Sequence, residues 1–180
     1  MFSSESKQKR VYIKIFIHNL KRGDDFLVIK WKELIISILI PLAVGGLSAL
    51  ITGGQMSDFM LLNQPPLSPP AWLFPVVWTV LYILMGIASY LVWQAKDKNT
   101  DLALKIYGLQ LFFNFFWSYI FFSLENYLFA FIWLLILWVL IIVTTVLFYR
   151  ISKPAGYLMI PYLLWVTFAA YLNLAIYILN

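Results

Sequence analysis

The chain has 180 residues, of which 63% are hydrophobic and 12% are charged. An average soluble domain is about 45–50% apolar and about 25% charged, so this chain has more apolar surface than a water-soluble core can hide. We therefore interpret it as an integral membrane protein with one compact membrane domain. Cysteine is absent and His18 is the single histidine, which excludes disulfides and leaves no His or Cys ligand for zinc or haem iron in the apolar stretches.

Residues 1–33 form a polar and basic segment ahead of the first apolar stretch. As a helix, this segment would carry a polar stripe of Lys14, His18 and Lys21 and could lie on an anionic membrane surface. Alternating apolar residues fit the same segment equally well, so a loosely ordered extension that only sets topology is the alternative. We expect a cytoplasmic extension at 1–33 and a membrane domain at 34–180.

Five apolar stretches follow, each long enough to cross about 30 Å of hydrocarbon as a helix of about 20 residues. They are Leu34–Thr52, Ala71–Ala95, Ala103–Leu124, Tyr127–Arg150 and Pro154–Leu179. The predicted fold class is an all-α membrane protein, a bundle of five transmembrane helices. The connection at 53–70 is rich in proline, and because proline fixes φ we expect a semi-rigid loop there.

Positive charge predicts the orientation of this bundle. Eight of the thirteen Lys and Arg lie in residues 1–33, and the other five flank the second and fourth connections. Five alternating helices would place all of them on one side of the membrane. The positive-inside rule then predicts a cytoplasmic N-terminus, with the proline-rich loop and the C-terminus outside.

The apolar stretches lack the groups that many membrane functions need. No Asp, Glu, Lys or Arg lies well inside any of the five. Ion and proton pathways require such groups, so the sequence argues against an ion channel or a proton-coupled pump. The same absence removes paired carboxylates, a Ser-His-Asp arrangement and a metal site from the core. If the protein performs chemistry, aromatic and hydroxyl side chains or the ligand must carry it.

Aromatic residues make up 19% of the chain, and part of this excess belongs to the interfacial belt of a membrane protein. Three stretches also carry stripes that include Trp at helical spacing. The stripes are Phe74, Trp78, Tyr82 and Met85; Asn114, Trp117 and Phe121; and Trp165, Ala169, Leu172 and Asn173. Such stripes indicate either ordinary packing or a pocket for a flat apolar ligand. The amide of Asn114 needs a partner in hydrocarbon, which could be another helix, a water or a ligand.

Small residues and one proline are expected to modify the helices. Close helix approach is predicted at small residues of two stretches, which are Gly45, Gly46, Ser48 and Ala49 in the first and Gly86, Ala88 and Ser89 in the second. Pro161 has no N–H and should kink or loosen the last helix about one turn before the indole of its stripe.

Several ordered motifs resemble those of the TspO/MBR family, the tryptophan-rich sensory proteins and translocator proteins also called peripheral-type benzodiazepine receptors. The resemblance covers about residues 40–180. Its motifs are Gln64-Pro65, Ser68-Pro69-Pro70, Phe74, Val77-Trp78, Leu81-Tyr82, Met85-Gly86, Ala88, Tyr90, Val92-Trp93, Gln110, Asn114 to Ser118, Phe121-Phe122 and the run from Pro161 to Asn173.

The resemblance implies a five-helix bundle, commonly a homodimer, whose pocket under the first loop binds porphyrins and drug-like ligands. By the resemblance, the ligand-binding positions are Phe59, Pro69, Phe74, Trp78, Tyr82, Asn114, Trp117, Trp165, Ala169 and Leu172. The ligand ring would stack among the three tryptophans, with the amide as a polar anchor. Trp78 and Trp165 match tryptophans linked to light-dependent porphyrin breakdown in some bacterial members, and they would be the catalytic residues of such an enzyme.

The chain also departs from the family pattern. Gln64 stands where the family has Lys, and Leu67 stands where it has Trp, so loop contacts to anionic ligand groups differ. The family usually has two neighbouring aromatic residues before the proline-rich loop, whereas this chain has Asp58-Phe59 and so only one aromatic ring there. The family's sterol-recognition pattern requires a Lys or Arg after Tyr171, and none follows.

We therefore expect a membrane binding protein, sensor or carrier for porphyrins and related flat apolar ligands. It should need no cofactor and no metal, and its partners should be the lipid bilayer, a tetrapyrrole or similar hydrophobic molecule and a second copy of the chain, without nucleic acid. A light-dependent porphyrin-degrading enzyme and a structural subunit without a ligand are the alternatives. The bacterial plasma membrane is the expected location, with the mitochondrial outer membrane as the alternative.

Overall fold

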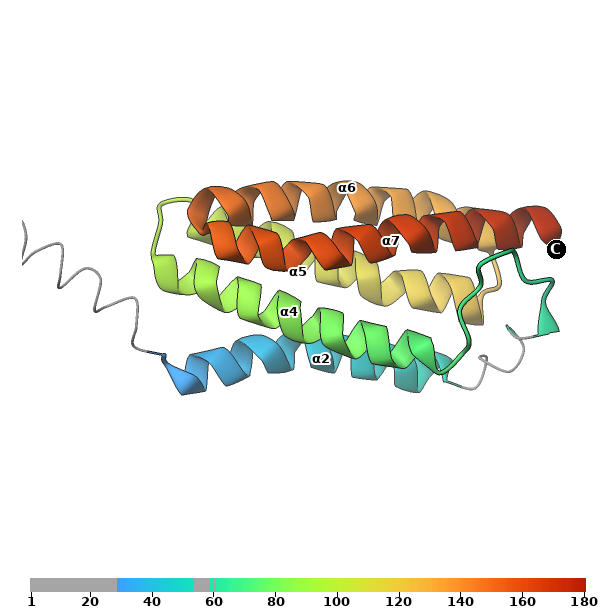
Figure 1. Ribbon diagram of the computed structural model, residues 1–180, viewed down its shortest axis with the longest axis horizontal. Helices are drawn as coiled ribbons and strands as arrows, with labels where there is room; N and C mark the ends of the chain where they lie inside the picture. Colours follow the sequence, from blue (N-terminus) through green and yellow to red (C-terminus); the bar gives the residue numbers. More distant parts are fainter. Residues whose placement is uncertain (1–28, 54–58, 60) are drawn as a thin grey trace, which may run out of the picture. The chain divides into compact units, whose positions relative to one another are not determined.

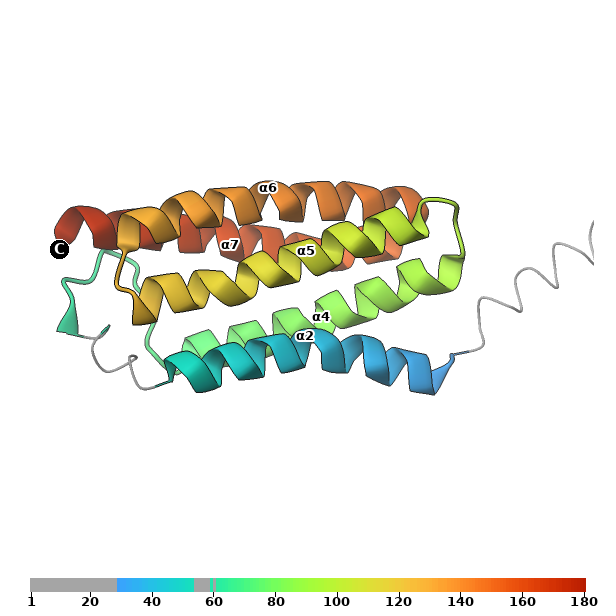
Figure 2. The ribbon, with the colours of Figure 1, turned by 180° about the vertical axis from the view of Figure 1, so that it is seen from behind.

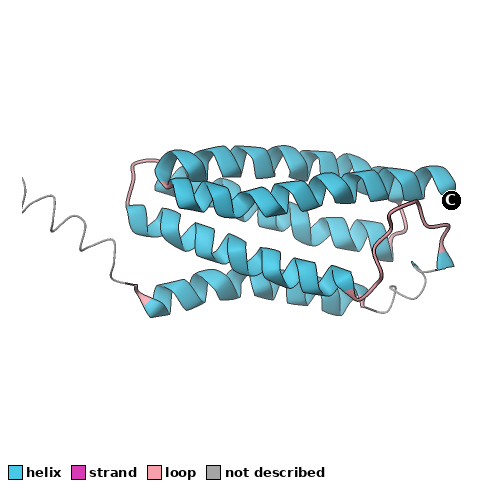
Figure 3. Ribbon diagram, in the orientation of Figure 1, coloured by secondary structure: helices cyan, strands magenta, loops and turns pink. Residues whose placement is uncertain are grey.

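The structure is a computed structural model that describes residues 29–53, 59 and 61–180. The basic extension expected at 1–33 therefore falls almost wholly outside the described residues. The chain divides into two compact units, Met1–Lys32 and Glu33–Asn180. Within the described residues every regular element is helical and no strand occurs (Figure 3).

The described fold consists of five long helices and one π-helical turn. They are α2 (Trp31–Thr52), α4 (Leu73–Ala95), α5 (Thr100–Ser118), η1 (Tyr119–Ser123), α6 (Tyr127–Ile151) and α7 (Lys153–Leu179). The predicted all-α class is confirmed. By length and composition, α2, α4, α6 and α7 are able to cross a membrane.

The third predicted stretch, Ala103–Leu124, differs from the structure. The α-helix of this region ends at Ser118, and the chain continues as a single π-helical turn. α5 is not one of the four helices that are apolar enough to be candidate spans. Asp101, Lys105 and the buried amide of Asn114 lower its mean hydropathy, so the sequence alone does not distinguish it from a helix of a soluble bundle.

α6 and α7 are antiparallel neighbours that meet at Ser152, and α4 packs against α7 and α5 (Figures 1 and 2). Gly156 permits the close approach at the start of α7, because a Cβ there would lie 2.5 Å from the Cβ of Tyr149. The α4–α5 and α6–α7 connections lie at one end of the bundle, and the C-terminus lies at the opposite end (Figure 1). Pro161 lies inside α7, which continues through it.

α2 is the least buried of the long helices. Of its 22 residues, Pro41, Ser48 and Thr52 are buried. It approaches α4 closely at Gly86, where a Cβ would lie 2.5 Å from the Cα of Ile38. The close helix approach predicted from this glycine is therefore present, and it is a contact that other residue types could not make without displacing the α2 backbone.

Candidate functional site

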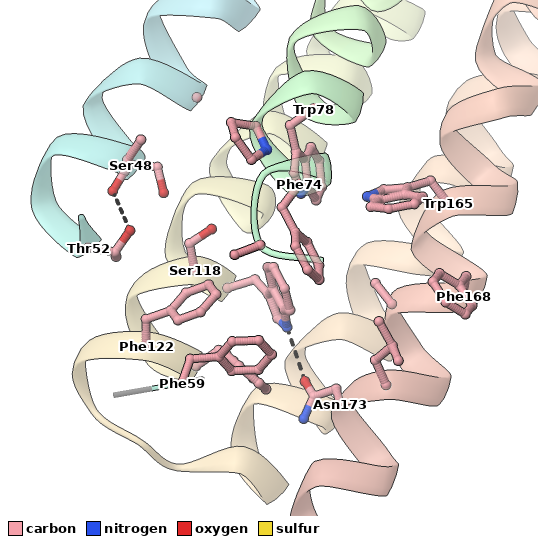
Figure 4. Close-up of a pocket in the computed structure, with 18 of the residues that line it drawn as sticks. Ser48, Thr52, Phe59, Phe74, Trp78, Ser118, Phe122, Trp165, Phe168 and Asn173 are labelled. Carbon is pink, nitrogen blue, oxygen red and sulfur yellow. Dashed lines mark hydrogen bonds between the residues drawn. The ribbon is translucent and has the colours of Figure 1, made fainter. Parts of the chain in front are cut away.

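A cavity of about 270 Å³ lies within the Glu33–Asn180 unit, at the end of the bundle that holds the C-terminus (Figures 1 and 4). Its walls come from the last turns of α2 and α5, the first turns of α4, the turn η1 and the C-terminal half of α7. The lining residues are Gly45, Ser48, Ala49, Thr52, Phe59, Ala71, Phe74, Pro75, Trp78, Tyr82, Trp117, Ser118, Phe121, Phe122, Trp165, Phe168, Ala169, Leu172, Asn173 and Ile176.

The structure brings most of the expected ligand-binding residues to this one cavity. Those that line it are Phe59, Phe74, Trp78, Tyr82, Trp117, Trp165, Ala169 and Leu172. Pro69 and Asn114 do not line it. Pro69 is half-buried in the loop before α4, whereas Asn114 is almost fully buried inside the bundle.

Asn114 lies behind Tyr82, with both ends of its amide engaged. The Tyr82 hydroxyl donates to Asn114 Oδ1 at 2.7 Å, and Asn114 Nδ2 donates to the Tyr162 hydroxyl at 3.1 Å. Gln110 Nε2 donates to the same hydroxyl at 3.3 Å. These bonds join α4, α5 and α7, so the amide has found helix partners, and a ligand would reach it only if Tyr82 moved aside.

The rings of the first two aromatic stripes are already in mutual contact. Trp78 stacks on Tyr82 at a centroid distance of 5.5 Å and lies 6.5 Å from Trp117. Because aromatic rings in direct contact have centroids about 4.5–7 Å apart, no ligand ring fits between these two tryptophans in this conformation. A ligand would instead stack on the faces of these rings that line the cavity, opposite Trp165. The ring centroids of Trp165 and Phe74 lie 6.1 Å apart in an edge-to-face pair.

Trp117 and Asn173 connect the cavity wall to the rest of the bundle. The Trp117 indole N–H donates to Asn173 Oδ1 at 3.2 Å, and Asn173 Nδ2 donates to the Tyr127 carbonyl at 2.8 Å (Figure 4). The bonds link α5, α7 and the start of α6. They satisfy a buried amide and a buried indole at once, which stabilises the wall rather than leaving polar groups for a ligand.

The turn η1 supplies two further lining residues of the cavity. The backbone N–H of Leu124 donates to the Tyr119 carbonyl at 3.1 Å, which is the wider π-helical spacing. Phe121 and Phe122 both line the cavity, as do neighbouring residues of a regular helix such as Phe168 and Ala169. Helical spacing from Asn114 and Trp117 identified Phe121 as part of the stripe but did not identify Phe122. Nothing in the sequence marks the π turn.

α2 contributes a wall of small residues that the sequence indicated only as packing positions. Gly45 faces Tyr82 so closely that any side chain there would overlap the phenol ring. Ser48 Oγ donates to the Phe115 carbonyl at 3.4 Å, and Thr52 Oγ1 donates to the Ser48 carbonyl at 2.9 Å. Phe168 was also missed, although its place three positions after a stripe residue puts it on the same helix face.

The chemistry available in the cavity is narrow. Among the residues that the structure describes, those that line it carry no charged side chain. The described part of the chain also holds no group of three or more His, Cys, Asp or Glu that could bind a metal. The cavity therefore offers aromatic faces and a few neutral polar groups, which suits recognition of a flat apolar molecule.

Residues 37–179 match the model of the TspO/MBR family. The chain is similar to the tryptophan-rich protein TspO of Chlorobaculum tepidum, with 40% identity over 77% of this chain and 90% of that protein. It is similar to the tryptophan-rich protein TspO of Archaeoglobus fulgidus, with 38% identity over 82% and 97%. It is also similar to the human translocator protein, with 35% identity over 72% of this chain and 79% of the relative.

Proposed function

Because this chain belongs to the TspO/MBR family, we propose that it is an integral membrane protein that binds porphyrins and related flat apolar ligands. The observation that carries the proposal is the aromatic cavity, in which three helices each contribute tryptophan or phenylalanine to one space. Pockets of this kind, largely apolar and placed between helices of a bundle, are typical of small-molecule sites. The names of the relatives, sensory protein and translocator protein, favour a sensor or carrier role.

The proposed topology has five membrane crossings, in which α5 crosses the membrane in addition to the four candidate spans. α5 lies between α4 and α6 in the chain, and two connections with positive charge share one end of the bundle (Figure 1). An even number of crossings would place one of these connections on the wrong side for the positive-inside rule. The N-terminus would be cytoplasmic, the cavity would open toward the outer face, and the membrane would be a bacterial plasma membrane. A homodimer is proposed from the family resemblance alone.

The size of the cavity limits how a tetrapyrrole would bind. Its volume of 270 Å³ falls just under the range of about 300–1,000 Å³ found for sites of drug-sized ligands. A whole macrocycle would therefore enter only with an outward shift of a wall. If only part of the macrocycle entered the cavity and the rest lay under the proline-rich loop, the wall would need to shift less.

The test is quenching of tryptophan fluorescence by protoporphyrin IX in the detergent-purified protein, first in the dark. Saturable quenching is expected, and Trp165→Ala should weaken it. Trp138→Phe is the control. The Trp138 indole on α6 donates a hydrogen bond to the Thr167 hydroxyl on α7 and does not line the cavity. Quenching without saturation, or saturation unchanged by Trp165→Ala, would overturn the proposal and favour a structural subunit.

The same titration under light tests the enzymatic alternative. New absorbance bands that form only under light and disappear in a Trp78→Phe, Trp165→Phe double variant would support porphyrin degradation at this site. Bands that persist without both tryptophans would exclude them as the reactive side chains.

A further inference from the structure

The chain segments that form the cavity contain no Lys or Arg. No Lys or Arg occurs in residues 33–95, 106–149 or 154–180. Every residue that lines the cavity belongs to one of these three segments. The cations after residue 33 all flank the α4–α5 and α6–α7 connections, at the opposite end of the bundle (Figure 1).

Negative charge, in contrast, does occur near the cavity. Glu125 lines a smaller neighbouring cavity, whose walls share Phe59, Phe121 and Phe122 with the main one. Its backbone has a φ of 50°, which fixes this residue in the turn that follows η1. Among the described residues, a ligand carboxylate at this end of the bundle would therefore meet like charge and no cation. An unpaired carboxylate that leaves water pays a large desolvation penalty, so an anionic ligand is disfavoured here.

One hydrogen-bond donor of the cavity is available to a neutral ligand. In the part of the chain that the structure describes, Trp165 Nε1 is buried and has no hydrogen-bond partner. Several other polar groups of the lining, on Ser48, Thr52 and Trp117, already bond to protein acceptors. Figure 4 shows the indole nitrogen of Trp165 turned toward Phe74, across the space where a ligand would stack. A buried donor without an acceptor is costly, so a ligand acceptor placed there gains affinity.

We propose that the cavity selects flat apolar ligands in their uncharged form, with the Trp165 indole N–H donating to a neutral acceptor such as an ester or amide carbonyl. This inference rests on the proposed function and names the ligand class of that same site. It predicts that esterified or otherwise neutral tetrapyrroles bind more tightly than those with free carboxylates.

The experiment compares protoporphyrin IX with its dimethyl ester by saturable fluorescence quenching of the full chain in uncharged detergent at pH 8. We expect the ester to bind at least about tenfold more tightly, because no cation compensates for burial of a carboxylate. Equal or tighter binding of the free acid would overturn the inference while leaving the proposed function intact. Absence of saturable binding for both compounds would overturn the proposed function and the inference with it.

A substitution in the loop tests the charge argument directly. Gln64 Nε2 donates to the carbonyl of Phe59 at 2.7 Å, so position 64 lies next to a residue that lines the cavity. Gln64→Lys should tighten binding of the free acid about tenfold and leave the ester within twofold, because the new ammonium can pair with a carboxylate. Gln64→Met is the neutral control of similar length. An unchanged preference in Gln64→Lys would overturn the charge argument.

Trp165→Phe tests the donor, since it removes the N–H and keeps an aromatic ring. We expect about tenfold weaker binding of the dimethyl ester, which can accept a hydrogen bond. Pyrene, a flat hydrocarbon without an acceptor, should lose less affinity than the ester, because it loses only stacking area. Equal weakening for both probes would show that Trp165 acts only by stacking and would overturn its role as donor.

Discussion

Asn114→Leu is expected to destabilise the bundle more than it weakens ligand binding. Asn114 forms two hydrogen bonds between helices, to the Tyr82 and Tyr162 hydroxyls at 2.7 and 3.1 Å. Such bonds between membrane helices contribute about 0.6 kcal/mol on average and at most about 1.7 kcal/mol. Loss of both should lower the free energy of unfolding by about 1–3 kcal/mol, and the Tyr82 hydroxyl loses its acceptor.

The assay is reversible unfolding in mixed micelles, combined with a double-mutant cycle against Tyr82→Phe. A coupling energy of about 0.6–1.7 kcal/mol between the two positions is expected, because each single substitution removes the same bond. Thr79→Val is the control, since the exposed Thr79 hydroxyl bonds only the Pro75 carbonyl of its own helix at 2.7 Å. Its effect should stay within about 0.5 kcal/mol.

The reasoning would be refuted by a coupling energy near zero. It would also be refuted if Asn114→Leu kept its stability and lost ligand affinity. The first result would mean that the bond between Asn114 and Tyr82 contributes little, and the second that the amide serves the ligand, as the polar anchor predicted from the sequence.

Gly86→Val should lower the free energy of unfolding by about 1–3 kcal/mol, because its side chain overlaps the α2 backbone, whereas Gly46→Ala, with no atom within 4 Å, should leave the melting temperature unchanged or slightly higher. Ala169→Phe should fill the cavity and abolish saturable quenching by protoporphyrin IX; a variant that still saturates would place the site elsewhere. The chain has no cysteine, so Ser68→Cys should react with an impermeant maleimide from outside and Asn99→Cys only after permeabilisation. The reverse labelling pattern would contradict the proposed orientation.

Helical periodicity predicted the aromatic faces because a straight α-helix fixes which residues share a side. Trp78 and Trp165 reach the same cavity for this reason, each from a regular part of its own helix. The spacing within α5 did not single out Phe122, which lies in the π turn after Ser118 and also lines the cavity. The i→i+5 bonding has no residue signature here, so only coordinates reveal it.

The partner of Asn114 could not be predicted for a different reason. A buried amide needs hydrogen bonds, and the sequence offers helix and ligand partners of equal chemistry. The choice depends on which side chains face it across the bundle. The Tyr82 and Tyr162 hydroxyls both reach it, from α4 and α7, and neither contact is encoded by spacing within a single helix.

The unequal attachment of the walls indicates where the cavity can enlarge. Hydrogen bonds through Asn114 join α4, α5 and α7, and the Trp117–Asn173 bond adds a second link between α5 and α7. α2 has three buried residues and one weak hydrogen bond across to the Phe115 carbonyl, at 3.4 Å. Moving α4 or α7 would break several buried bonds, whereas moving the end of α2 exposes small side chains that a flat ligand can cover again. Ligand entry should therefore displace α2 and leave the four-helix remainder of the bundle in place.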